Sequence, residues 1–93
     1  MAAQKLLTYL QRFAAEKALG LDFVTKEPTR NGAEYFFPVD YWEDLVLLGL
    51  AVREARDGRF IYRLTLEAAE EVIGREIGYD RFRMLSLKHK AIR

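Results

Sequence analysis

LVLLGLAVREARDGRFIYRLTLEAAEEVIG, residues 45–74, contains the strongest fold signals in the chain. Within this stretch, the runs 50–55 and 59–64 are rich in residues that favour β-strands. They flank Asp57-Gly58, a dipeptide typical of a two-residue hairpin turn, because both turn positions need positive φ. The stretch therefore predicts an antiparallel hairpin.

A short helix is expected immediately before the hairpin, over residues 41–48. Asp40 occupies the N-cap position, and Glu43 stands three residues later in the capping-box position. Gly49 would end this helix, because glycine adopts the left-handed conformation at little cost. The residues expected to face the core are Trp42, Leu45, Val46 and Leu48.

A longer helix is expected after the hairpin, over residues 66–77. Thr65 would cap its N-terminus and Gly78 would end it, which leaves Gly74 inside the helix. Apolar residues recur at helical spacing and predict one buried face. Its members are Leu66, Ala69, Val72, Ile73 and Ile77.

The N-terminal third follows the same pattern. A helix is expected over 2–19, closed by Gly20, and two strand-forming runs, 21–26 and 33–37, flank a loop with an Asn-Gly turn signal. The order helix–hairpin–helix–hairpin–helix indicates an α+β domain. Two explanations fit the repetition: an internal duplication, or the need of any helix-then-hairpin unit for glycine at these turns. The inward residues of the first helix are Leu6, Leu10, Phe13, Ala14 and Leu19.

The last segment, residues 79–93, admits two interpretations. Phe82 and Leu85 would share one face of a helix that Asp80 caps, whereas residues 81–84 alternate as a strand does. We favour the helix.

The composition indicates a single domain over residues 1–93. Its 15 basic and 14 acidic side chains nearly cancel, whereas disordered chains are high in net charge and poor in aromatics. The absence of cysteine excludes disulfides and thiolate zinc sites and fits a reducing compartment, so we expect a cytoplasmic protein. No window approaches the ~18 apolar residues of a membrane span, so we expect no membrane partner.

The order Leu48-Gly49-Leu50, Asp57-Gly58 and Leu64-Thr65 resembles the winged-helix family of DNA-binding regulators. In that family a recognition helix ends in Leu-Gly-Leu, an Asp-Gly wing follows, and a strand ending in Leu-Thr opens the next helix. The resemblance covers residues 45–74, about a third of the chain. It implies a winged-helix-like fold and contact with DNA.

Two features depart from that family. Pro28 and Pro38 fall where the family has a second helix, and proline suits a hairpin better there. The helix that would enter the major groove carries Asp40, Glu43 and Asp44 and has no lysine or arginine. Because carboxylates repel phosphate, this helix favours a different kind of partner.

Residues 34–44 hold the most distinctive chemistry, with five large rings between positions 35 and 42. Most of these rings are expected in the core, but an exposed Phe36 or Tyr41 would be an anchor for a protein partner. The leading hypothesis is therefore a regulatory module of adaptor or inhibitor type that binds a protein, with a homodimer as one form of that interaction. The candidate residues are Glu34, Phe36, Asp40, Tyr41, Glu43 and Asp44.

Positive charge gathers in two segments. Residues 79–93 carry +4 (5 − 1) and residues 50–65 carry +2 (4 − 2). They support the alternative of a DNA-binding regulator, although such charges also serve simply to keep a hairpin and a chain end solvated. The candidate nucleic-acid-binding residues are Arg53, Arg56, Arg59, Arg63, Arg81, Arg83, Lys88, Lys90 and Arg93.

Residue types and spacing give no catalytic constellation. His89 is the only histidine and Ser86 the only serine, so a two-histidine metal site is excluded and neither residue has the context of a triad. The glycines fall singly, which excludes a glycine-rich phosphate loop. We therefore expect no enzymatic activity, no cofactor and no metal.

Overall fold

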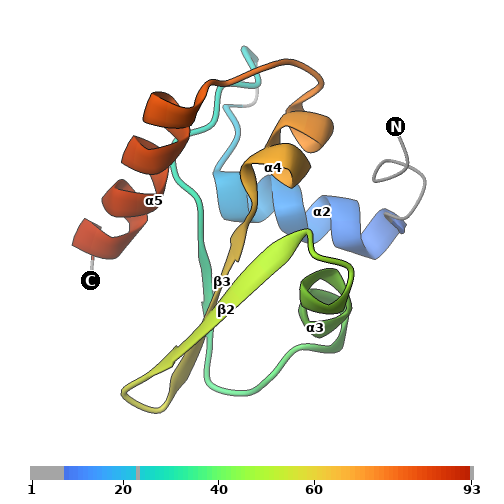
Figure 1. Cartoon of the computed structure of the whole chain (residues 1–93), viewed down its shortest axis with the longest axis vertical. Helices are drawn as coiled ribbons and strands as arrows, with labels where there is room; N and C mark the ends of the chain where they lie inside the picture. Colours follow the sequence, from blue (N-terminus) through green and yellow to red (C-terminus); the bar gives the residue numbers. More distant parts are fainter. Residues whose placement is uncertain (1–7, 23, 93) are drawn as a thin grey trace.

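The computed structural model describes residues 8–22 and 24–92, with side chains as far as residue 86. In this part of the chain, four helices surround a three-stranded antiparallel sheet with the order β1-β3-β2 (Figure 1). The fold is therefore α+β, as predicted. The elements are α2 (Tyr9–Leu19), β1 (Ala33–Tyr35), α3 (Asp40–Leu47), β2 (Ala51–Arg56), β3 (Arg59–Leu64), α4 (Leu66–Ile73) and α5 (Tyr79–Ile92).

The β2–β3 hairpin confirms the central prediction. The strands pair from Ala51 opposite Leu64 to Arg56 opposite Arg59, which leaves two residues for the turn. Both turn residues have positive φ, 54° at Asp57 and 74° at Gly58. This geometry matches the right-handed twist of the two strands.

Helix α3 ends as predicted but begins differently. Gly49 has φ 78°, and the Leu50 N–H donates to the Leu45 carbonyl at 2.9 Å, which closes the helix. The N-cap residue is Val39, which provides no side-chain cap, so the prediction of Asp40 as N-cap with a Glu43 capping box is wrong. Asp40 is the first helical residue instead.

Helix α4 is shorter than predicted. Thr65 caps it, because its hydroxyl accepts from the Ala68 N–H at 3.2 Å. The helix stops at Ile73, where Gly74 takes the left-handed conformation (φ 88°), so the predicted end at Gly78 is wrong. The following segment leads to α5, and the helical interpretation of residues 79–92 is confirmed. The predicted cap at Asp80 is wrong, because the helix begins at Tyr79 and Asp80 lies within its first turn.

Helix α2 buries only part of the predicted face, because Ala14 and Leu19 lie in the core as expected but Leu10 and Phe13 do not. Its buried residues are Gln11, Ala14, Ala15, Ala18 and Leu19. Leu10 and Phe13, expected in the core, are 60% and 53% exposed. Leu6 lies outside the described residues. The face with small side chains packs inward, because α2 crosses close to α3 and α4.

The predicted first hairpin does not form. The described residues between Gly20 and Gly32 contain no strand, and β1 pairs with β3 instead. The Asp22 carboxylate accepts from the N–H groups of Val24 and Thr25, both at 2.8 Å, and Lys26 has φ 62°. These local turns replace an extended strand. The two halves of the chain therefore do not repeat one structural unit.

Asn31, predicted in the turn of that hairpin, is a fully buried residue that extends the sheet. Its side-chain amide donates to the Leu64 carbonyl and accepts from the Leu64 N–H, both at 3.0 Å. The amide group thus extends the β1–β3 pairing to Leu64, two residues beyond the pair of Ala33 with Tyr62. Its nitrogen also lies 3.3 Å from the Ser86 hydroxyl, which links α5 to the sheet.

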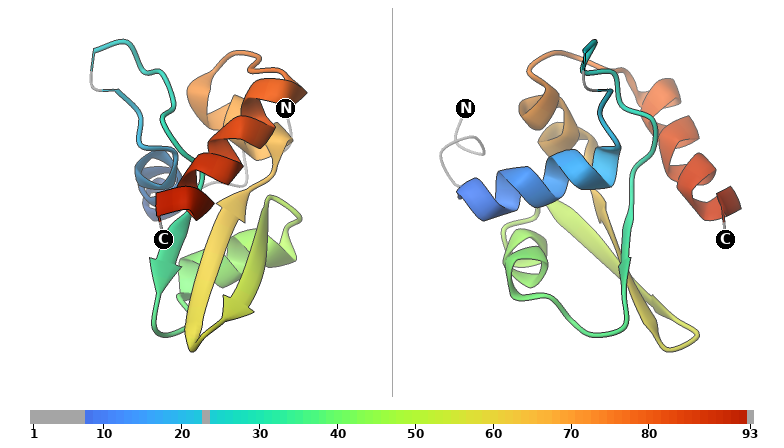
Figure 2. Two further views of the ribbon diagram at one scale, coloured as in Figure 1. Left: turned by 90° about the vertical axis from the view of Figure 1, so that its left-hand side faces the viewer. Right: turned by 180° about the vertical axis from the view of Figure 1, so that it is seen from behind.

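The sheet separates two layers of helices. Helices α2, α3 and α4 lie on one side, and α5 lies on the other (Figures 1 and 2). On the α3 side, Tyr62 is fully buried and stacks on Trp42 with ring centroids 5.4 Å apart. On the α5 side, Ile61 and Leu85 are buried.

Candidate protein-interaction surface

Helix α3 presents a continuous stripe of exposed residues. Asp40, Asp44 and Leu47 follow one another at intervals of four and three, which places them on one face of the helix, opposite the buried Trp42. Leu47 is 85% exposed, and Leu48, expected in the core, is 43% exposed. We call Asp40, Asp44, Leu47 and Leu48 the outer stripe. It is acidic at its N-terminal end and apolar at its C-terminal end.

Two phenylalanines precede the outer stripe in an exposed loop. Phe36 and Phe37 are 68% and 76% exposed. The alternation expected over residues 33–37 stops at Tyr35, where β1 ends, so neither ring is directed into the core by the strand. The guanidinium of Arg59 lies 5.7 Å from the centre of the Phe36 ring. The exposure of Phe36 agrees with its choice as a candidate anchor. The exposure of Phe37 was not predicted.

Glu43 belongs to a structural cluster and not to the outer stripe. Its carboxylate accepts hydrogen bonds from the Tyr62 hydroxyl and from Arg53, whose Nη1 lies 3.1 Å away. The bond from Tyr62 is the main cause that lowers the pKa of Glu43. Burial, followed by this same bond, raises the pKa of Tyr62. Glu43 therefore serves to hold α3 against the sheet.

Glu34 and Tyr41 also lie outside the predicted acidic surface. Glu34 lies on the α5 side of the sheet, where it forms an ion pair with Arg59. Tyr41 is half-buried and lines a groove beside α2. Of the six predicted protein-binding residues, Asp40 and Asp44 remain together on the outer stripe, and Phe36 lies in the loop that leads to it.

The arginines of the β2–β3 hairpin all have carboxylate partners. Arg53 pairs with Glu43, and Arg59 pairs with Glu34. Arg56 and Arg63 share the carboxylate of Glu54, at 3.3 and 3.0 Å. The four arginines face three glutamates, so with Asp57 in the turn the local charge is zero (4 − 4). The predicted basic surface of the hairpin is thus largely neutralised.

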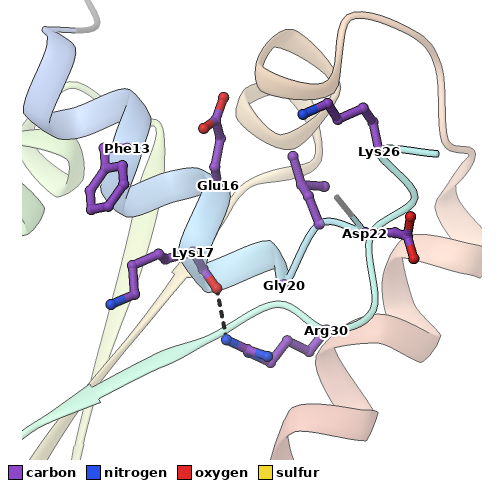
Figure 3. A pocket seen from close by; sticks show the side chains of 8 residues that line it. Phe13, Glu16, Lys17, Gly20, Asp22, Lys26 and Arg30 are labelled. Carbon is purple, nitrogen blue, oxygen red and sulfur yellow. Dashed lines mark hydrogen bonds between the residues drawn. The ribbon is translucent and has the colours of Figure 1, made fainter. Parts of the chain in front are cut away.

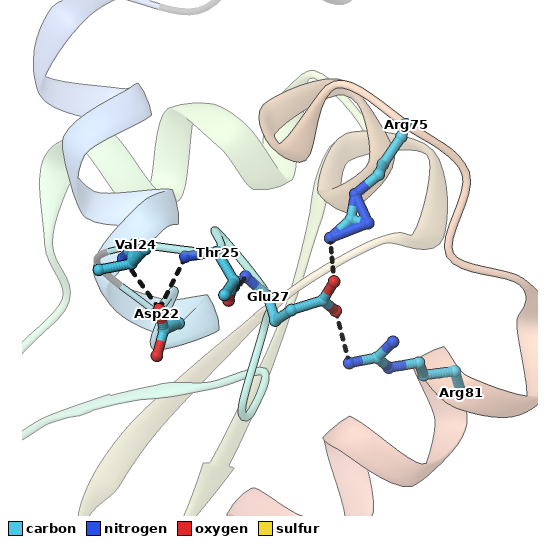
Figure 4. A network of polar contacts seen from close by, with 6 residues as sticks. All are labelled: Asp22, Val24, Thr25, Glu27, Arg75 and Arg81. Carbon is cyan, nitrogen blue, oxygen red and sulfur yellow. Dashed lines mark hydrogen bonds and ion pairs between the residues drawn. The ribbon is translucent and has the colours of Figure 1, made fainter.

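The basic C-terminal segment is partly tied to the loop after α2. Glu27 bridges Arg75 at 2.7 Å and Arg81 at 2.9 Å, and so joins the loop to both ends of the α4–α5 connection (Figure 4). Arg83 is exposed. The side chains of Lys88 and Lys90 and the whole of Arg93 lie outside the described residues.

A groove that the sequence did not indicate runs along α2. It consists of two hollows of about 340 and 490 Å³, both of which are lined by Phe13, Lys17 and Arg30. Figure 3 shows the smaller one. Tyr35 and Tyr41 line the larger hollow. Its only sequence signal is the apolar spacing of Leu10 and Phe13, which is equally typical of core residues.

The described residues contain no cluster of three or more histidine, cysteine or acidic side chains placed to hold a metal ion. Within the same residues, no helix has the length and apolar character that crossing a membrane requires.

Comparisons give no relative. No family model, no curated protein and no solved structure matches the chain. A proposal about function therefore depends on the surfaces of the molecule alone.

Proposed function

We propose that this protein is a small, non-enzymatic regulatory module of adaptor or inhibitor type, which binds a protein partner through residues 36–48. The observation that carries the proposal is the exposure of large apolar side chains beside carboxylates that form no ion pair among the described residues. The apolar members are Phe36, Phe37, Leu47 and Leu48, and the acidic members are Asp40 and Asp44.

The energetics favour a polypeptide partner. Covering an exposed leucine or phenylalanine with apolar surface stabilises a complex by roughly 1.5–3 kcal/mol for each side chain. Aromatic residues at the centre of an interface contribute most, and charged residues at its rim select the partner. Asp40 and Asp44 favour a basic rim on that partner and disfavour a phosphate backbone.

Two surface variants test the proposal. Leu47→Ser removes the most exposed apolar side chain of the outer stripe. Asp44→Lys replaces a negative charge of the stripe with a positive one. Both positions are exposed, so neither change should lower thermal stability much. With tagged full-length protein as bait, we expect a partner that wild type retains to be lost from both variants, because its apolar or its charged contact is removed.

The matched control is Glu76→Lys, the same reversal of charge at an exposed position after α4. It should retain the partner as wild type does. Benzoylphenylalanine in place of Leu47 should cross-link to the partner, whereas the same group at Glu76 should not. Size-exclusion chromatography distinguishes a second copy of this chain from a different protein. Equal partner recovery by wild type, Leu47→Ser and Asp44→Lys would contradict the proposal.

A second candidate function is a winged-helix-like DNA-binding regulator. The observation that favours it is the hairpin that follows α3 directly and carries Arg53, Arg56, Arg59 and Arg63. Ion pairs with glutamates weaken this candidate, because each pair must open before the arginine contacts a phosphate. The segment between α2 and α3 also lacks a helix among its described residues.

Salt-graded mobility shifts with random duplex DNA test this candidate. If it is correct, log affinity should fall steeply with log salt, and the double variant Arg56→Ala/Arg59→Ala should reduce the slope by about 0.9 for each lost phosphate contact. Arg12→Ala on α2 is the control for charge alone. Absence of any shift at low salt excludes the candidate.

A further inference from the structure

The groove beside α2 is built from residues that usually belong to a core. Leu10 and Phe13 lie at helical spacing with the buried Ala14, yet both are more than half exposed. They border the larger hollow together with Tyr41 from α3 and Ala33 from β1. The apolar side chains of α2 thus extend beyond the part of the helix that packs against the core. The excess opens into a space of the size that binds small ligands and peptide side chains.

The wall shared by the two hollows has a distinct charge. Its members are Phe13, Lys17 and Arg30, an aromatic ring with two cations and no carboxylate. Both cationic groups lie below the Phe13 ring in the view of Figure 3. Three carboxylates also line the groove, but outside this wall. The Glu16 carboxylate points away from both cationic groups in Figure 3, Asp22 accepts bonds from loop amides, and Glu34 pairs with Arg59.

Arg30 is held in position before any ligand binds. Its Nη2 donates to the Lys17 carbonyl at 2.8 Å, at the C-terminal end of α2. This contact uses one of the five N–H donors of a guanidinium and fixes the direction of the others. Lys17 is exposed and forms no ion pair among the described residues. The two cations can therefore bind an anionic group that lies next to the Phe13 ring.

We propose that this groove binds an extended polypeptide segment that carries an apolar and an acidic side chain two residues apart, and therefore on the same face. The apolar side chain packs against Leu10 and Phe13, and the carboxylate two residues along lies between Lys17 and Arg30. Charge complementarity selects an acidic segment, and the two linked hollows select an extended one. This inference does not depend on the outer stripe of α3, which favours a basic partner surface.

Fluorescence anisotropy with two labelled octapeptides tests the proposal on the full chain. One peptide repeats the order Leu-Ser-Glu-Ser, which places leucine and glutamate on one face of an extended chain, and its twin has lysine in place of each glutamate. The acidic peptide should bind saturably and the basic twin should not. Lys17→Gln and Arg30→Gln should each weaken binding by about tenfold, the effect of one charge-assisted hydrogen bond. Phe13→Ser should weaken it as well.

The matched control is Arg12→Gln, which removes one positive charge from α2 outside the groove. It should leave affinity unchanged, as should Asp44→Lys on the outer stripe, so that failure of this proposal and failure of the proposed function are distinguishable. Thermal unfolding verifies each fold, and Lys17→Gln, which removes no hydrogen bond of the described structure, keeps the test decisive if Arg30→Gln unfolds.

Three results of the peptide titrations would overturn the proposal. They are no saturable binding of the acidic peptide up to millimolar concentration, equal binding of the basic twin, and equal loss of affinity in Arg12→Gln and Lys17→Gln. Dodecanoate serves as competitor, because a fatty acid also joins a carboxylate to an apolar group. Displacement of the peptide by dodecanoate at lower concentration than by unlabelled peptide would assign the groove to a lipid and likewise overturn it.

Discussion

The two sides of the sheet differ in what they contribute. On the α3 side, the rings of Tyr35 and Tyr62 meet edge to face with centroids 5.9 Å apart, and Trp42 stacks on Tyr62. On the α5 side, Ile61 is buried, but its neighbours Arg59 and Arg63 are charged and partly exposed. One side of a small sheet is therefore enough to build the core, and the other remains open to solvent except where α5 covers it.

The largest effect should follow removal of Trp42. Trp42 is fully buried and its indole Nε1 donates to the Tyr35 hydroxyl at 3.2 Å. Trp42→Ala should destabilise the fold by about 3–5 kcal/mol, because it leaves a cavity and removes this hydrogen bond. Urea unfolding measures the change. A loss below about 1 kcal/mol would mean that the α3 side is not the principal core.

Removal of Leu85 measures the α5 side in the same way. Leu85 is 6% exposed on α5, and the next residue, Ser86, is bonded to Asn31 beside the sheet. Leu85→Ala should cost about 2 kcal/mol, the lower end of the range for leucine, whereas Leu45→Ala on the α3 side should cost about 3–4 kcal/mol. Equal losses in urea unfolding would remove the contrast between the two sides.

The pH dependence of stability tests the polar cluster on the α3 side. The folded-state pKa of Glu43 is lowered from 4.5, so its stabilising effect is complete above that value and is lost as pH falls through the lower folded pKa. The pKa of Tyr62 is raised from 10.0, so its effect is present below pH 10 and is lost as pH rises through the higher folded pKa.

We therefore expect urea midpoints to fall at both extremes of pH. Glu43→Gln should flatten the acid limb, because glutamine does not titrate. Tyr62→Phe should flatten the alkaline limb and also weaken the acid limb, since its hydroxyl is the main cause of the low pKa of Glu43. Wild-type and Glu43→Gln profiles that run parallel below pH 5 would assign the acid limb to other carboxylates.

The smallest effect should come from the charged residues of the α5 side. The ion pair of Arg59 with Glu34 is partly exposed on both partners, and such pairs contribute roughly 0–1 kcal/mol. Arg59→Ala should therefore shift stability by less than about 1 kcal/mol in thermal unfolding, and the shift should shrink in high salt. A loss as large as that of Leu85→Ala would contradict the assignment of this side as solvated surface.

The sequence was a good guide where structure is set by near neighbours. Asp57-Gly58 predicted the hairpin because a two-residue turn fixes the pairing of both strands by itself. Gly20 and Gly49 marked helix ends for the same local reason. After α4, both Gly74 and Gly78 have positive φ, so either glycine could have ended the helix. The sequence alone therefore did not distinguish the observed end at Gly74 from the predicted end at Gly78.

The sequence was a poor guide where the partner is distant. Asn31 bonds to Leu64, 33 residues away, so its local Asn-Gly signal predicted a turn that does not form. The acidic candidates were separated for a similar reason: Glu43 and Glu34 are engaged by arginines of the hairpin. Asp40 and Asp44 stayed together because helical spacing alone places them on one face.

The burial of Asn31 also affects the rate at which its side chain is deamidated. An asparagine followed by glycine readily loses its amide as ammonia, through attack of the glycine nitrogen on the side-chain carbonyl. Here the Gly32 N–H donates to the Ala18 carbonyl at 3.0 Å, and the amide of Asn31 is held by Leu64. Folding thus protects the side-chain amide of Asn31 from attack by the Gly32 nitrogen, whereas unfolding exposes it to this attack. Mass spectrometry after incubation in urea, compared with buffer, would record the difference, and the aspartate produced would place a negative charge against the Leu64 carbonyl.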